Sequence, residues 1–118
     1  MNNFRELIVW QKSIDLVVKI YDVTKGFPKE EKFGLISQMQ RAATSIPSNI
    51  SEGAGRNTNA WFKQFLTISL GSAHELETQI IISKKLGYIN DEYHNLLLTD
   101  LTGIHKMLYS LHNSLKAD

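Results

Sequence analysis

Two pairs of residues in this chain have the spacing of metal ligands on one helix, Asp91-x-x-His94 and His74-x-x-Glu77. A di-iron site in a helical bundle takes carboxylates from all four helices and a Glu-x-x-His pair from two of them. Here Asp91 stands at the expected start of a helix, and the order of the His74–Glu77 pair is reversed. We therefore expect solvent-facing histidines, with no metal ligands and no cofactor.

Residues for catalysis do not form a recognisable pattern either. Serines are plentiful, but none has the glycine-flanked setting of a nucleophile elbow. Gly53-Ala54-Gly55-Arg56 follows no predicted strand, so it does not match a phosphate-binding loop. Glu75 and Glu77 point in nearly opposite directions on a helix, so they cannot act together within one chain. We expect no catalytic residue and a protein that is not an enzyme.

Basic side chains are candidates for phosphate binding. Arg5, Lys12 and Lys19 recur at seven-residue steps, and Arg56 and Lys63 lie near each other along the chain. The formal net charge is only +1, from 13 basic and 12 acidic residues, so attraction to nucleic acid must come from local clusters. These five residues are our candidate nucleic-acid contacts. A solvated face with alternating ion pairs is the alternative interpretation.

A polar line and an apolar line share the segment around Pro47. The apolar line keeps one helical register through the proline, and it contains Ile36, Met39, Ala43, Ile46 and Ile50. The polar line contains Gln38, Arg41, Ser45, Ser48 and Glu52. One helix that is kinked at Pro47 explains both lines, because proline removes a backbone donor and pushes against the preceding turn.

Glycine and proline divide the chain into four helical segments. We expect helices from about Arg5 to Thr24, from just after Phe27-Pro28 to a stop at Gly53, from Asn59 to Leu86, and from a cap at Asn90 onward. Asn57 or Thr58 would cap the third helix, and Gly87 would terminate it. The fold class is all-α, an up-down-up-down antiparallel four-helix bundle in a single domain spanning residues 1–118.

The predicted first helix has an unusually wide apolar surface. Leu7, Trp10, Ile14, Val17 and Tyr21 form one seam, and a second line on an adjacent face contains Val9, Leu16 and Ile20. Together they cover more than half of the circumference. We favour a helix that also faces a partner chain over one that is deeply wrapped.

Several classes of protein are excluded by what the sequence lacks. Without cysteine, the chain has no disulfides and no thiolate chemistry. It has no secretory signal pattern and no window approaching the ~20 apolar residues of a membrane span. We expect a cytoplasmic protein that does not enter a membrane.

Long motifs of this chain resemble one known family. They include Leu7-x-x-Trp10-Gln11-Lys12, Phe33-Gly34-Leu35, Gln38-x-x-Arg41-Ala42-Ala43-x-Ser45-Ile46-Pro47-x-Asn49-Ile50-x-Glu52-Gly53-x-x-Arg56, Gly71-Ser72-x-x-Glu75-Leu76-Glu77-Thr78 and Leu86-Gly87-Tyr88. The pattern is similar to that of the 23S ribosomal RNA intervening-sequence proteins, which are small bacterial four-helix bundles. The resemblance extends to accessory proteins of diversity-generating retroelements.

The resemblance implies a homopentamer and a possible RNA or DNA partner. Gln38, Arg41, Ser45 and Glu52 match the family motif, and we expect them at or near a subunit boundary, where Arg41 would pair with Glu52 or Glu75. A solvated polar face is the alternative. For function, an accessory factor that binds nucleic acid and a scaffold that binds another protein both remain open.

Overall fold

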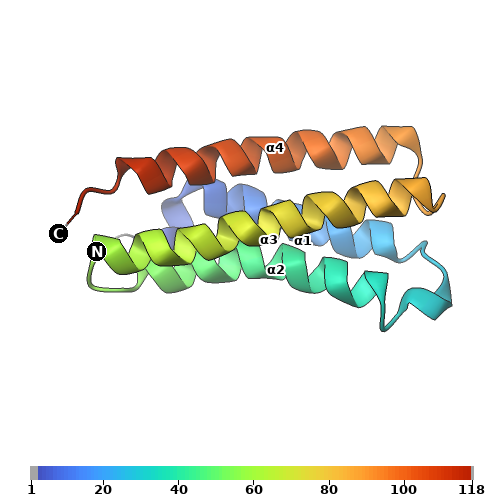
Figure 1. The fold of residues 1–118 in the computed structure, drawn as a ribbon, viewed down its shortest axis with the longest axis horizontal. Helices are drawn as coiled ribbons and strands as arrows, with labels where there is room; N and C mark the ends of the chain where they lie inside the picture. The colour runs from blue at the N-terminus through green and yellow to red at the C-terminus, as the bar shows by residue number, and fades with distance from the viewer. Residues whose placement is uncertain (1–2, 118) are drawn as a thin grey trace.

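The structure, a computed structural model, describes residues 3–117. Within them, four α-helices run antiparallel along one long axis (Figure 1): α1 (Ile8–Thr24), α2 (Leu35–Ala54), α3 (Asn59–Lys85) and α4 (Asp91–Ser114). Two short 3-10 turns, η1 (Phe4–Glu6) and η2 (Lys29–Glu31), precede α1 and α2. The same residues contain no strand. The predicted all-α, up-down-up-down antiparallel bundle is confirmed.

The helices form a closed ring of neighbours around one core. Each helix contacts the next, and α1 also contacts α4. The molecule is elongated, with principal extents of 47 × 24 × 20 Å. Its core is built from fully buried aliphatic side chains of all four helices, including Leu16, Ile20, Met39, Ile46, Ile50, Leu66, Leu76, Ile80, Leu97, Leu101, Ile104 and Leu108.

The first helix begins later than its sequence predicted. Arg5 lies in η1, Leu7 is extended with φ −70° and ψ 121°, and α1 begins at Ile8. The side chain of Asn3 caps η1, and the Phe4 ring packs edge-on against Trp10 at 5.3 Å. These contacts stabilise a separate turn and explain why the helix does not extend back to Arg5.

The two apolar lines of α1 are not equivalent. Val9, Ser13, Leu16, Ile20 and Thr24 are buried. The seam that starts at Leu7 lies at the margin, where Ile14 and Tyr21 are exposed. The line that faces the core therefore includes two polar residues, and both hydroxyls donate to backbone carbonyls inside the helix.

The second helix differs from the prediction at both ends. Pro28 precedes η2, and α2 begins only at Leu35, whose N–H donates to the Glu31 carboxylate at 3.1 Å. Its apolar line is buried as predicted, apart from the half-buried Ile36. The helix continues through Pro47 to Ala54. The kink at Pro47 stays a prediction.

Gly53 does not terminate α2, which corrects the sequence prediction. It lies inside the helix, and a Cβ there would meet the Phe65 Cβ at 2.7 Å and the Phe62 ring at 3.0 Å. Glycine is required at this position because α2 and α3 approach so closely, and not because of a left-handed backbone.

The third and fourth helices have the predicted caps. Thr58 and Asn90 accept hydrogen bonds from the N–H groups of Trp61 and Tyr93, at 3.2 and 2.8 Å. Gly87 adopts φ +79° and ends the α3 segment, as predicted. The N–H of the next residue, Tyr88, returns to the Ser83 carbonyl.

Candidate functional site

Small polar side chains join α2 to α3 around Pro47. Ser69 donates to the Ile46 carbonyl at 2.9 Å, and the Ser72 hydroxyl donates to the Ser45 hydroxyl at 2.8 Å. The Asn49 amide donates to both the carbonyl and the hydroxyl of Ser45. Short side chains allow the two backbones to come close while satisfying each other's polar groups. The motif residues Ser45 and Asn49 therefore have a structural role within one protomer.

Beside this network, a shallow groove opens between α2 and α3. Its volume is about 370 Å³, and it is lined mainly by Gln38, Arg41, Ser45, Ser72 and Glu75. We call it the polar groove. Three of the four predicted interface residues, Gln38, Arg41 and Ser45, therefore lie on one continuous surface.

Arg41 is an exposed cation in this groove. Among residues 3–117 it has no carboxylate within ion-pair distance, although Glu75 lines the same groove. Glu52, the fourth predicted interface residue, does not line it. Its carboxylate instead accepts a hydrogen bond from Arg56 at 2.8 Å, one helical turn further on.

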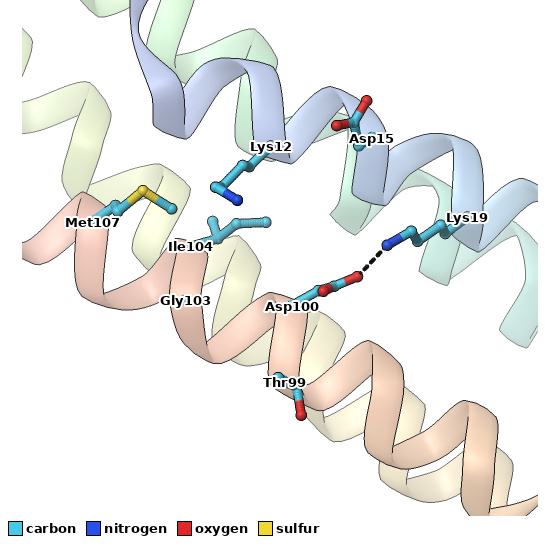
Figure 2. Close-up of a pocket in the computed structure, with 8 residues that line it drawn as sticks. All are labelled: Lys12, Asp15, Lys19, Thr99, Asp100, Gly103, Ile104 and Met107. Carbon is cyan, nitrogen blue, oxygen red and sulfur yellow. Dashed lines mark hydrogen bonds and ion pairs between the residues drawn. The ribbon is translucent and has the colours of Figure 1, made fainter.

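Lys12 and Lys19 line a different cavity, between α1 and α4. It has a volume of about 310 Å³ and also includes Asp15 and Asp100. Figure 2 shows Lys19 reaching across to Asp100, with which it forms an ion pair, and Lys12 extending toward Ile104. Because both signs of charge line the cavity, it provides no uniform attraction for a phosphate.

The remaining basic candidates belong to segments at one end of the bundle. Arg5 lies in η1, Arg56 in the connection between α2 and α3, and Lys63 in the second turn of α3; η1 contacts α2 at this end (Figure 1). The guanidinium of Arg56 lies 5.0 Å from the Phe65 ring centroid and 5.5 Å from that of Trp61. We call Arg5, Arg56 and Lys63 the basic end.

The predicted stripe of Arg5, Lys12 and Lys19 is not continuous. Its seven-residue spacing requires one helix, but Arg5 lies outside α1. The structure thus divides the five candidate residues into a mixed-charge cavity and the basic end. Sequence spacing missed this division because periodicity does not show the Asn3 cap and the Phe4–Trp10 contact that stabilise η1 as a separate turn.

Neither a metal cluster nor a spanning helix emerges from the described part of the chain. Residues 3–117 contain no group of three or more histidine or carboxylate side chains that could hold an ion. No helix in the same range is long and apolar enough to cross a bilayer. A contact that sequence reasoning missed does join two histidines, His74 of α3 and His105 of α4.

Comparisons with known proteins point to one family. The model of the 23S rRNA-intervening sequence protein family matches residues 5–110. No functionally curated protein matches the chain. A crystal structure from Bacteroides thetaiotaomicron VPI-5482, of a protein with unknown function from the S23 ribosomal protein family, is 32% identical and superposes with a TM-score of 0.83. That similarity covers 90% of this chain and 96% of the other.

Proposed function

This chain belongs to the 23S rRNA-intervening sequence protein family, and on that premise we propose that it is a non-catalytic, homo-oligomeric bundle that associates with nucleic acid in the cytoplasm. The family resemblance suggests five subunits. The proposal has two parts, self-association and phosphate binding, which separate experiments test.

Self-association is supported above all by the exposed apolar side chains of α1. Ile8 and Val18 are 61% and 59% exposed in the protomer, and Ile14 and Tyr21 are also exposed. Ile14, Val18 and Tyr21 follow one another at steps of four and three, which places them on one helix face. We call Ile14, Val18 and Tyr21 the α1 apolar flank. Covering such a surface with a second copy removes apolar area from water, which favours association.

The polar groove supplies a second surface for a neighbouring copy. Arg41 has no ion-pair partner among residues 3–117, and it shares the groove with Glu75 and two serines. Guanidinium groups bind carboxylates through two parallel hydrogen bonds, so a carboxylate of the adjacent subunit is a suitable partner. In the assembly Arg41 would then be partly buried and its charge neutralised.

Replacing Arg41 tests this contact. We expect Arg41→Ala to reduce the assembly size measured by light scattering, because removing one member of a buried ion pair costs about 3–5 kcal/mol. Lys85→Ala is the matched control, since Lys85 is an exposed cation on α3. An unchanged mass for Arg41→Ala would contradict the placement of the polar groove at a subunit boundary.

Nucleic-acid association is supported by the basic end. Arg5, Arg56 and Lys63 belong to different segments that meet there, and in an oligomer this end would be repeated. Several copies of this end close together would raise the positive electrostatic potential there, although the net charge of each chain is only +1. The aromatic rings beside Arg56 restrict its guanidinium, which reduces the entropy lost on binding a phosphate.

A salt series with structured RNA tests this part. We expect binding at low salt that weakens as salt rises. In a plot of the logarithm of the binding constant against the logarithm of salt concentration, the slope for Arg56→Gln/Lys63→Gln should be smaller in magnitude by roughly 0.7 to 0.9 per lost phosphate contact. Lys32→Gln/Lys85→Gln makes the same charge change near the opposite end of the bundle, so it should retain the wild-type slope. Equal slopes for the two double variants would remove the basic end from the proposal.

A protein-binding scaffold is the second candidate function. Two of the five candidate cations, Lys19 and Arg56, already pair with Asp100 and Glu52, and this reduces the charge available to phosphates. The absence of RNA binding at low salt would favour the scaffold, with the polar groove or the α1 apolar flank as the contact surface. Self-association could still hold in that case, because it is measured independently.

A further inference from the structure

His74 and His105 meet on the outer side of the α3–α4 pair. Their Nε2 atoms lie 2.8 Å apart, although the residues are 31 positions apart in the sequence. The ring centroids are 4.5 Å apart and the ring planes differ by 59°. Two rings that met head-on with their Nε2 atoms 2.8 Å apart would have centroids farther apart than 4.5 Å. The two rings therefore meet at an angle.

This geometry is close to that of two imidazoles bound to one metal ion. Two metal–nitrogen bonds of about 2.0–2.1 Å, meeting at about 90° to 110°, hold their nitrogens roughly 2.9–3.4 Å apart. In the absence of metal, one neutral imidazole donates a hydrogen bond to the other. If the donor ring moves its proton from Nε2 to Nδ1 by exchange with solvent, both rings stay neutral and both Nε2 lone pairs are left for the ion. Only a few tenths of an ångström of separation would then have to be gained.

The pair is also accessible to an ion from solution. His74 is exposed and His105 is half-buried. The Tyr109 ring centroid lies 5.8 Å from that of His105, one turn further along α4. Since residues 3–117 offer no third histidine or carboxylate at this position, water molecules would complete the coordination.

We propose that His74 and His105 form a two-histidine binding site for a late first-row divalent metal ion such as Cu²⁺, Ni²⁺ or Zn²⁺. Neutral imidazole suits these ions, and Cu²⁺ binds most tightly in the usual order of affinities. With two protein ligands, the dissociation constant should be on the order of micromolar, well above that of a four-ligand structural site. The bound ion would cross-link α3 to α4 independently of RNA binding and self-association.

Titration of the full chain with Cu²⁺ tests the site. We expect one ion bound per chain, with an electron paramagnetic resonance spectrum that shows hyperfine coupling to imidazole nitrogens. His74→Gln/His105→Gln should weaken this binding roughly tenfold or more, because even indirect supports of metal ligands contribute that much. The matched control is His94→Gln/His112→Gln, which removes the other two histidines of the chain and should bind as the wild type does.

A second measurement follows the cross-link itself. The thermal midpoint of the wild type and of the His94→Gln/His112→Gln control should rise with added Ni²⁺, whereas that of His74→Gln/His105→Gln should not. Circular dichroism without metal establishes that each variant is folded. Wild-type affinity in His74→Gln/His105→Gln, or the absence of bound Cu²⁺ and of imidazole coupling in the wild type, would overturn the proposal.

Discussion

At the scale of single residues, a missing side chain at Gly53 determines how closely α2 and α3 approach. The space that a Cβ would need is already taken by Phe62 and Phe65. Protein interiors are packed so densely that one added methyl group forces its neighbours or the backbone to shift. Gly53 thus acts in the same interface as the serines, which also keep the two backbones close together.

Gly53→Ala should destabilise the protein by about 1–3 kcal/mol because it overpacks this contact. Gly55→Ala is the control two residues away, where a Cβ would lie 3.6 Å from its nearest atoms and φ is −82°. That variant should be neutral or slightly stabilising. Urea denaturation of the two variants checks the difference, and equal midpoints would show that the helices can separate at no cost.

Tyr88 links the connection after α3 to η2. Its hydroxyl donates to the Glu31 carboxylate at 2.8 Å. This hydrogen bond, together with partial burial and the negative charges of Glu31 and Glu30, raises the pKa of Tyr88 above its ordinary value of 10.0. The folded state favours the protonated phenol. The resulting stabilisation is therefore present below pH 10 and is lost as pH rises through the raised pKa.

The Tyr88 phenol should consequently ionise late in an ultraviolet absorbance titration. The difference between the wild-type and Tyr88→Phe curves isolates its ionisation. Glu31→Gln removes the carboxylate charge, so the pKa of Tyr88 should fall toward its ordinary value. If Glu31→Gln left the Tyr88 titration unchanged, the negative charge of Glu31 would not contribute to the shift.

At the scale of the helix, ends that local chemistry determines were predicted well. Asn57 or Thr58 was expected to cap α3, Asn90 to cap α4 and Gly87 to terminate α3. The structure has Thr58 as the cap of α3 and confirms Asn90 and Gly87. Each is a local arrangement of side chain and backbone, so the neighbouring sequence contains the necessary information. The starts of α1 and α2 also depend on nearby residues, through the contact of Phe4 with Trp10 and the hydrogen bond from Leu35 to Glu31, but hydrophobic periodicity does not encode such contacts.

Hydropathy did not predict which face of α1 is buried in the core. Hydropathy ranks Ile14 above Ser13, yet Ser13 is buried and Ile14 is exposed. The Ser13 hydroxyl donates to the Trp10 carbonyl at 2.8 Å, so its burial leaves that donor satisfied. Periodicity identified both apolar lines but could not choose between them.

Part of the candidate site could also be predicted from the sequence. Helical spacing placed Gln38, Arg41 and Ser45 on one face, and they do line one groove. Glu52 and Arg56 also have the four-residue spacing of a helical pair, but the expected stop at Gly53 left Arg56 outside the helix, and spacing along one helix could not show that His74 faces His105. The first depends on the position of the helix end, and the second on how two helices are aligned.

Asn90→Ala tests how much the predicted cap of α4 contributes. The Asn90 side chain accepts the Tyr93 N–H at the exposed start of this helix. Its removal should lower the free energy of unfolding by about 1 kcal/mol, whereas Asn90→Gly should cost only a few tenths. Thermal denaturation of both variants is the measurement. A loss that is as large for glycine as for alanine would mean that capping is not the cause.

At the scale of the whole molecule, the bundle is tighter on one side than on the other. α2 and α3 are joined by hydrogen bonds between small side chains. Of the neighbouring helix pairs, α1 and α4 contact each other least, and the Lys19–Asp100 ion pair links them. Tyr21 of the α1 apolar flank lines a pocket with Ile36 and Gln40 of α2, so association through this flank would add contacts on the α2 side of α1 and not between α1 and α4.

Val18→Lys should separate assembly from folding. Val18 is 59% exposed in the protomer, so the change should alter protomer stability by no more than about 0.5 kcal/mol. In an interface the new charge would be buried without a partner, and the mass should fall toward the 13.4 kDa of one chain. Thr102→Lys, at an exposed polar position of α4, should keep the wild-type mass. Equal masses for both variants would place the α1 apolar flank outside any interface.

The elongated outline of the protomer, 47 Å long but only 24 and 20 Å across, also affects how it rotates in solution. A rod tumbles slowly end over end and quickly about its own axis. The amide N–H bonds of all four helices lie nearly along that axis, so nitrogen-15 relaxation in every helix reports the slow motion. Copies packed side by side would form a rounder particle with more isotropic rotation. The anisotropy of rotational diffusion therefore distinguishes an isolated protomer from a lateral assembly without changing a single residue.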